Sequence, residues 1–194
     1  QAKTENGILW LNQADSTNSE LRRRLPELES FSVIAAASQT AGRGQGTHSW
    51  YSSPDTNLTF SILFRFESEY RLKVSEAILI TCVTTLGIRD YLLERGITAR
   101  IKWPNDIWVS EKKVCGILIE NILESEYVRE SIVGIGLDVN ETAWPEELPN
   151  PVSMKEITGK DYELRSELVS LRRSIVGRFS LLGTPKGRDL LRER

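Results

Sequence analysis

A glycine-rich segment, residues 38–50, constrains the fold more than any other stretch of this sequence. It reads Ser-Gln-Thr-Ala-Gly-Arg-Gly-Gln-Gly-Thr-His-Ser-Trp and lies between two apolar runs, residues 31–37 and 57–66. Short apolar runs bounded by turn residues favour strands, so the segment is predicted to join two strands. Glycine lets a ligand approach the backbone, consecutive amides bind anions, and arginine grips carboxylate or phosphate. The segment therefore predicts an anion-binding loop, with a mobile surface loop as the alternative.

The whole chain has the composition of an ordinary globular protein. Its 194 residues predict one domain, and a net charge of -2 gives no general reason to expect binding to nucleic acid or to a membrane. The apolar run 78–88 is too short to span a bilayer, and no signal peptide is expected at the start. Cys82 and Cys115 lie in apolar contexts, which is typical of reduced core residues in a cytoplasmic protein. With His48 as the single histidine, a His/Cys zinc site is not expected.

Hydrophobic periodicity predicts an α+β fold. Thr17 with Glu20 has the spacing of a capping box, and Ser75 is expected to cap a long helix. Strands are expected over residues 8–11, 32–37, 57–66, 99–102, 107–109, 113–121 and 127–139, and helices over 18–25, 76–94 and 164–182. This order predicts a mixed sheet with the long helices on one side.

Two groups of arginines raise the alternative of a nucleic-acid module. They are residues 22–24 and the pair Arg172 and Arg173 on the predicted C-terminal helix, which also carries Arg178 outside its apolar stripe. No aromatic residues are interleaved with them, as an RNA-binding surface would require. We therefore expect these charges to be solvated on helix faces.

Several short motifs follow one another in a fixed order along the chain. They are Ser16-Thr-Asn, Gln39-Thr-Ala-Gly-Arg-Gly ending in Trp50, Asn57-Leu before a strand, Lys102-Trp-Pro-Asn-Asp, Lys113-Val-Cys-Gly-Ile-Leu and Gly134-Ile-Gly-Leu-Asp-Val-Asn. Each motif is weak alone, but the series resembles the catalytic domain of biotin protein ligases, also called biotin–[acetyl-CoA-carboxylase] ligases. The resemblance covers residues 9–140, and residues 102–106 and the glycine-rich loop are its most specific parts.

The resemblance implies both a fold and a reaction. The fold would be a mainly antiparallel mixed sheet packed against helices, like the class II aminoacyl-tRNA synthetases and biotin ligases. Biotin would react with Mg-ATP to give biotinyl-5′-AMP, and a lysine of a biotin carboxyl carrier domain would then attack this anhydride. No covalent enzyme intermediate is implied, no nucleic-acid partner is expected, and a homodimer stays open.

The resemblance also assigns roles to individual residues. Arg43 and Lys113 are the expected catalytic residues, which hold the carboxylate of biotin and the phosphoryl oxygens. Asp106 is the expected ligand of Mg²⁺ or its waters, since hard cations prefer carboxylate oxygen. The other residues expected to bind biotin are Ser16, Thr17, Asn18, Gln39, Gly42, Trp50, Gly116, Gly134, Gly136 and Leu137. ATP contacts are expected from Arg43, Gln45, His48, Trp50, Lys102, Asn105, Lys113, Asp138 and Asn140.

Three positions depart from the family pattern. Gln45 and His48 stand where many relatives have arginine, which predicts a looser grip on the triphosphate or on biotinyl-AMP. Asp138 stands where relatives usually have asparagine, and an ionised aspartate only accepts hydrogen bonds. Adenine binding is therefore expected to be weaker or differently arranged, with Asn140 as a possible compensating residue.

The chain is expected to form one catalytic domain, and two alternative functions stay open. Residues 1–183 are expected to form the catalytic domain and 184–194 a tail, without an N-terminal DNA-binding domain and without an apparent small C-terminal β domain. One alternative is a ligase of the same superfamily that acts on lipoate or another acyl acid. Another is a catalytically weak homologue that binds biotin or a nucleotide. The presence of both Arg43 and Lys113 favours activity.

Overall fold

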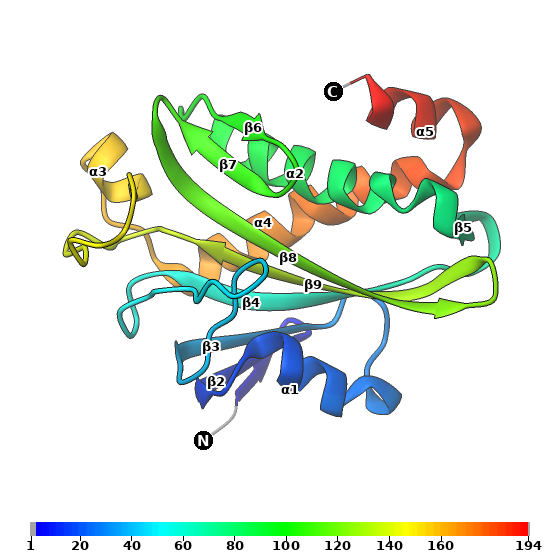
Figure 1. The fold of residues 1–194 in the computed structure, drawn as a ribbon, viewed down its shortest axis with the longest axis horizontal. Coiled ribbons are helices and arrows are strands. Elements are labelled where there is room, and N and C mark those ends of the chain that lie inside the picture. The colour runs from blue at the N-terminus through cyan, green and yellow to red at the C-terminus, as the bar shows by residue number, and fades with distance from the viewer. Residues whose placement is uncertain (1–2, 194) are drawn as a thin grey trace.

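The computed structural model describes residues 3–193 and contains one nine-stranded sheet (Figure 1). The strands lie in the order β1 (Lys3–Glu5), β2 (Ile8–Ala14), β3 (Val33–Gln39), β4 (Leu58–Arg65), β9 (Tyr127–Leu137), β8 (Lys112–Glu124), β7 (Asp106–Val109) and β6 (Arg100–Lys102), and β5 (Leu72–Lys73) pairs with β9. Strands β2 and β3 are parallel, whereas the other pairs among the described residues are antiparallel. The predicted α+β class with a mixed, mainly antiparallel sheet is confirmed.

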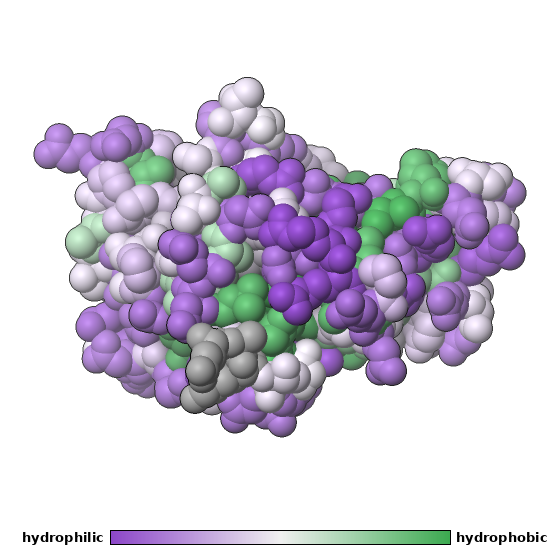
Figure 2. Space-filling view, turned by 90° about the horizontal axis from the view of Figure 1, so that it is seen from below, coloured by the Kyte–Doolittle hydropathy of each residue, from purple (hydrophilic) through white to green (hydrophobic). Residues whose placement is uncertain are grey.

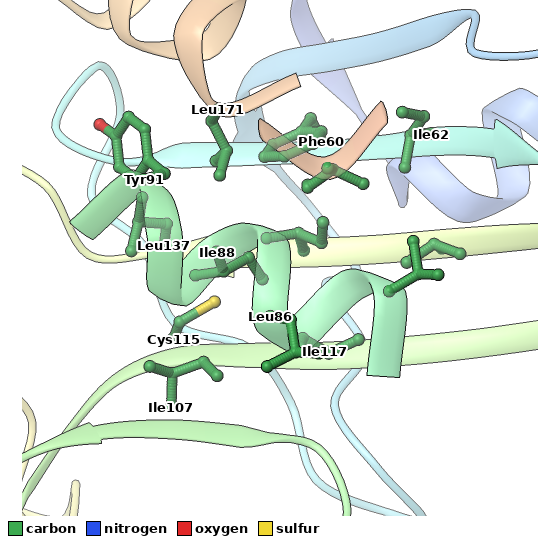
Figure 3. Packing of buried hydrophobic residues seen from close by; sticks show 14 of the residues in the cluster. Phe60, Ile62, Leu86, Ile88, Tyr91, Ile107, Cys115, Ile117, Leu137 and Leu171 are labelled. Carbon is green, nitrogen blue, oxygen red and sulfur yellow. The ribbon is translucent and has the colours of Figure 1, made fainter. Parts of the chain in front are cut away.

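The main core lies between the sheet and two long helices, α2 (Ile78–Leu93) and α4 (Leu164–Phe179). Alternate residues of β4 face these helices, as their spacing predicted, and Figure 3 shows Phe60 beside Leu171 of α4, while Leu86 of α2 lies beside Ile117 of β8. The apolar stripe of the C-terminal helix is likewise buried: Leu168, Leu171, Ile175, Phe179 and Leu182. Cys82 and Cys115 are both buried in this core.

A third helix, α1 (Thr17–Arg23), lies on the opposite face of the sheet. It buries Leu21 against Ile34, Leu63 and Ile132 in a separate small cluster. The long helices α2 and α4 lie together on one side, as predicted, and the short helix α1, for which no side was predicted, lies on the other. The reason is topological, because the chain between the parallel strands β2 and β3 must cross one face of the sheet.

The predicted capping box at the start of α1 is wrong. The N-cap residue is Ser16, and its side chain makes no capping hydrogen bond. Thr17 instead lies 2.8 Å from the Ser61 hydroxyl, and Glu20 pairs with Arg23 and Arg24. A capping box does occur at α3 (Met154–Thr158), where Ser153 and Glu156 form both reciprocal bonds. Burial of the first turn of α1 against β4 decided which polar partners its side chains found.

The predicted helix cap at Ser75 is also wrong. Ser75 does not cap α2, because it lies inside a 3-10 turn, Val74–Glu76, and α2 follows Ala77 without a side-chain cap. Other 3-10 turns are Leu25–Glu27, Ser68–Tyr70 and Ser180–Gly183. The chain continues into α5 (Pro185–Arg192), whose Leu191 is fully buried in the main core.

Two of the arginines expected to be solvated are engaged in tertiary contacts. Arg172 donates hydrogen bonds to the backbone carbonyls of Asn6 and Phe31, and Arg178 pairs with Asp90 at 2.6 Å. On the face viewed in Figure 2, which is the α1 side, hydrophilic residues surround separate patches of hydrophobic ones. Between residues 3 and 193, no helix is long and apolar enough to cross a bilayer.

Candidate functional site

A cavity of about 460 Å³ lies on the α1 side of the sheet. Its floor follows the strand register from Thr59 through Gly136, Gly116 and Asp106 to Lys102. Because the two glycines carry no side chains, the middle of this row leaves room for another group to lie against the sheet. Predicted site residues that line the cavity are Ser16, Thr17, Asn18, Gln39, Arg43, Gln45, His48, Trp50, Lys102, Asn105, Asp106, Lys113, Gly116, Gly134 and Gly136. The structure thus gathers residues that are far apart in the sequence around one space.

The glycine-rich loop joins β3 to β4, as predicted, and folds back on itself beside the cavity. Gly44 donates to the carbonyl of His48 at 2.7 Å, and Trp50 donates to the carbonyl of Gly42 at 3.1 Å. A Cβ on Gly42 would lie 2.9 Å from the carbonyl oxygen of Trp50. Gly42 does not line the cavity, and its absent side chain permits this close turn.

The indole of Trp50 lies directly on the glycine floor. A Cβ added at Gly136 would be 2.2 Å from Cε2 of Trp50, and one added at Gly116 would be 2.8 Å from Cζ3. The group that approaches the backbone closely at both strand glycines is therefore the indole of Trp50. The buried Nε1 of Trp50 finds no hydrogen-bond acceptor among residues 3–193.

A chain of polar side chains crosses the sheet at the α1 end of the cavity. Asn18 donates from Nδ2 to Glu120 Oε2 at 2.9 Å, its Oδ1 contacts the Ser61 hydroxyl, and Arg43 Nη2 lies 3.2 Å from Glu120 Oε2. Gln39 holds the start of α1 by accepting from the Thr17 amide at 2.9 Å. Ser61 and Glu120 were not among the predicted site residues. The sequence signal that could have indicated them is a polar residue at an alternate position of an otherwise apolar strand.

Both predicted catalytic cations are paired with protein carboxylates. Lys113 Nζ lies 2.9 Å from Asp106 Oδ1, and Arg43 pairs with Glu120. Lys113 Nζ is also 5.7 Å from the ring centroid of Trp50, above the floor. Arginine and lysine at such a site bind carboxylate or phosphate and offset negative charge that develops in a reaction.

The predicted metal ligand, Asp106, is a single carboxylate. No group of three or more His, Cys, Asp or Glu side chains within residues 3–193 is arranged to hold an ion. Mg²⁺ normally keeps several waters and uses one or two carboxylates together with substrate phosphates. Asp106 therefore fits Mg²⁺ that arrives with a nucleotide better than a permanently bound ion.

Polar contacts around the turn before β7 hold two further predicted residues. Asn105 donates from Nδ2 to the Ile117 carbonyl at 3.0 Å, which fastens the turn to β8. Lys102 places its Nζ 3.8 Å from the ring centroid of Trp108, a cavity residue that sequence analysis did not single out. Both residues are thus positioned at the cavity edge by β6, β7 and β8.

Besides Gly42, three predicted residues do not line the cavity: Leu137, Asp138 and Asn140. Leu137 is buried in the main core near Tyr91 (Figure 3), because Val133, Ile135 and Leu137 alternate toward this core while Gly134 and Gly136 face the cavity. Asn140 uses both ends of its amide on the backbone of Tyr162, at 2.8 and 3.0 Å. Leu137 supports the floor from behind, and Asn140 fixes the segment that follows β9.

Asp138 is a buried carboxyl without a compensating partner. Its side chain is 3% exposed, and its Oδ1 receives no hydrogen bond from residues 3–193. Burial raises the pKa of this carboxyl well above its usual range, and the charge of Glu141 raises it further, against the opposing effect of Lys113. A protonated carboxyl has one donor and remaining acceptor capacity, like asparagine. The expected effect of Asp138 on adenine binding stays a prediction.

Replacing Asp138 with asparagine is expected to stabilise the fold at pH 8, because a neutral amide avoids the cost of ionising this buried carboxyl or of keeping it protonated at that pH. The pKa of the Asp138 carboxyl is higher in the folded than in the unfolded protein. Its contribution to the stability of the wild type is therefore complete below the unfolded pKa and is lost as pH rises through the folded pKa. Asparagine does not titrate. The difference in Tm between the variant and the wild type should therefore grow from pH 4 to pH 8, and a constant difference would contradict this assignment.

Comparison with known proteins adds independent findings. The sequence matches the model of the Biotin/lipoate A/B protein ligase family over residues 10–138. It is 33% identical over 131 residues to the bifunctional ligase/repressor BirA of Bacillus subtilis, which covers 66% of this chain and 39% of that protein. It is 33% identical over 132 residues to the biotin–[acetyl-CoA-carboxylase] ligase of Paracoccus denitrificans, covering 66% of this chain and 53% of that protein. The chain thus spans well under two thirds of the length of these relatives.

Solved structures show the same likeness. The biotin protein ligase from Aquifex aeolicus in complex with biotin and ATP superposes with a TM-score of 0.75 at 31% identity, covering 91% of this chain and 71% of that chain. The Leishmania major biotin protein ligase in complex with biotinyl-5-AMP gives a TM-score of 0.76 at 23% identity, covering 98% and 80%. The second likeness concerns the fold alone.

Proposed function

Because this chain belongs to the Biotin/lipoate A/B protein ligase family, we propose that it activates biotin with ATP and transfers the biotinyl group to a lysine of a biotin carboxyl carrier domain. The observation that carries the proposal is the cavity, which brings Arg43 and Lys113 to one space with most of the residues expected to contact biotin and ATP. The likeness to the Aquifex aeolicus complex with biotin and ATP supports it.

The proposed chemistry needs two anions held side by side. A carboxylate oxygen of biotin attacks the α-phosphorus of ATP, the bond to the β-phosphate oxygen breaks, and pyrophosphate leaves. In the second step the amine of the acceptor lysine attacks the carbonyl of the mixed anhydride and AMP leaves. Lys113 and Arg43 would bind the carboxylate and the phosphate and offset the charge on phosphorus. Asp106 would hold Mg²⁺, which would supply further charge neutralisation on the nucleotide phosphates.

The direct test is intact-mass analysis of a biotin carboxyl carrier domain after incubation with the protein, Mg-ATP and either biotin or lipoate. We expect a biotin-dependent mass increase on the carrier. If the carrier stays unmodified while biotinyl-AMP and pyrophosphate form, the chain carries the first step only. Modification by lipoate instead would establish the alternative acid, which the family also includes. Absence of all products would favour a binding role. A cytoplasmic location and a homodimer stay predictions.

Restoring an arginine at position 45 is expected to slow the dissociation of biotinyl-AMP about 10-fold. Gln45 is exposed in the loop and lines the cavity, so a guanidinium there would reach an anionic ligand. A hydrogen bond to a charged group contributes about 1.5–3 kcal/mol, enough for a tenfold effect. Thr47→Arg is the matched control, because Thr47 is exposed in the same loop but does not line the cavity. Equal dissociation rates for the wild type and Gln45→Arg would refute the prediction.

A further inference from the structure

We propose that Glu120 is a positioning residue that acts through Arg43. Its carboxylate serves as an internal counter-anion that holds the glycine-rich loop in a resting position, and the anionic group of an entering substrate replaces it as the partner of Arg43. This inference rests on the proposed function for the identity of the substrate. The resting position itself rests on contacts in the chain alone.

The contacts of Glu120 join three separate elements. Glu120 lies on β8, and both of its oxygens face the guanidinium of Arg43, at 3.2 and 3.3 Å. The same carboxylate accepts from Asn18 Nδ2 at 2.9 Å and lies 3.9 Å from Arg22. The loop, the start of α1 and β8 therefore meet at one carboxylate. A bidentate arginine–carboxylate pair fixes orientation as well as distance.

In this position both cations already have carboxylate partners. Lys113 Nζ lies 2.9 Å from Asp106 Oδ1, and Arg43 uses both of its terminal nitrogens on Glu120. That edge of the guanidinium is occupied. Arg43 must therefore leave Glu120 before it can hold the carboxylate or phosphate of a substrate in the same two-bond geometry.

The structure is suited to this exchange. The hydrogen bonds of Gly44 with His48 and of Trp50 with Gly42 close the loop on itself, so it can move without losing them. When Arg43 leaves, Glu120 retains its hydrogen bond from Asn18 and the nearby charge of Arg22. The carboxylate is therefore not left without a partner. The side chain of Glu120 is 24% exposed, so its remaining charge is also partly hydrated.

Glu120→Gln tests the proposal, because glutamine keeps an oxygen for Asn18 but loses the charge that holds Arg43. Without any ligand, trypsin cleavage between Arg43 and Gly44, normalised to cleavage at other sites, should rise about fivefold. Biotin should bind about 3–10-fold more tightly to this variant. In an Arg43→Ala background, adding Glu120→Gln should leave biotin affinity unchanged. Glu124→Gln is the control, since it removes an exposed carboxylate from the same strand.

The outcomes separate this inference from the proposed function. Unchanged cleavage at Arg43 in Glu120→Gln would overturn the counter-anion role, whether or not biotin binds. Weaker biotin binding by Glu120→Gln would also overturn it, because Glu120 would then act only on Asn18. An equal gain in biotin affinity when Glu120→Gln is added to Arg43→Ala would overturn it too, because Glu120 would then act through its general charge. If no variant binds biotin, the proposed function fails, while the proteolysis still decides whether Glu120 holds the loop.

Discussion

Replacing Lys113 with alanine is expected to lower the rate of carrier biotinylation by about 100–1000-fold, the range seen when one group that stabilises developing charge is removed. Lys113 lies in the cavity beside Gly116, 2.9 Å from Asp106, and is the expected partner of the carboxylate and the phosphoryl oxygen. Alanine removes that cation from the site. The loss should appear in the formation of biotinyl-AMP, measured in a single turnover, more than in the affinity for biotin.

The matched control is Lys112→Ala. Lys112 is the exposed neighbour on the same strand and does not line the cavity, so its removal changes the net charge equally without touching the site. The Lys113–Asp106 pair is partly exposed to solvent, and we expect the Lys113→Ala variant to stay folded. A Lys113→Ala enzyme with the single-turnover rate of the Lys112→Ala enzyme would exclude the assigned role.

Gly87→Ala is expected to destabilise the fold by about 1–3 kcal/mol, the usual cost of overpacking a core. Gly87 is buried in the middle of α2, where a Cβ would lie 2.6 Å from the Cα of Ile175 on α4. The close atom belongs to the backbone, so a side-chain rotation cannot relieve the contact. The two helices would have to separate, and the apolar contacts between them would weaken.

Gly177→Ala is expected to stabilise the fold instead. Gly177 is exposed in α4, and nothing lies within 4 Å of its added Cβ, so alanine contributes only its higher helix propensity, about 1 kcal/mol. Urea denaturation of both variants measures the two free energies of unfolding. Destabilisation by both substitutions, or by neither, would show that contact with Ile175 does not limit the packing of α2 on α4.

Local sequence patterns determined most of the secondary structure. The alternation from Leu58 to Phe66 predicted one face of β4, and the spacing from Leu164 to Leu182 predicted α4, because each pattern depends on the geometry of a single element. The helix caps at Thr17 and Ser75 were wrong because a capping motif competes with tertiary partners. For Thr17 that partner is the hydroxyl of Ser61 on β4.

The order of motifs along the chain indicated the family, and the family match supports it. Most of the residues that line the cavity belong to those motifs. Leu137 was misplaced by one residue, since neighbouring residues of a strand face opposite sides of the sheet. The raised pKa of Asp138 was likewise beyond the sequence, because it depends on how deeply the carboxyl is buried and on the charge of Glu141.

The sequence by itself determined the elements, the fold class and the chemical types gathered at the site. Only the tertiary structure decided which charges are paired within the protein. Glu120 and Arg43 are 77 residues apart, and their contact follows from the register of β8 and the path of the loop. Such a pairing depends on several elements at once. A periodic pattern, which reports on one element at a time, carries no information about it.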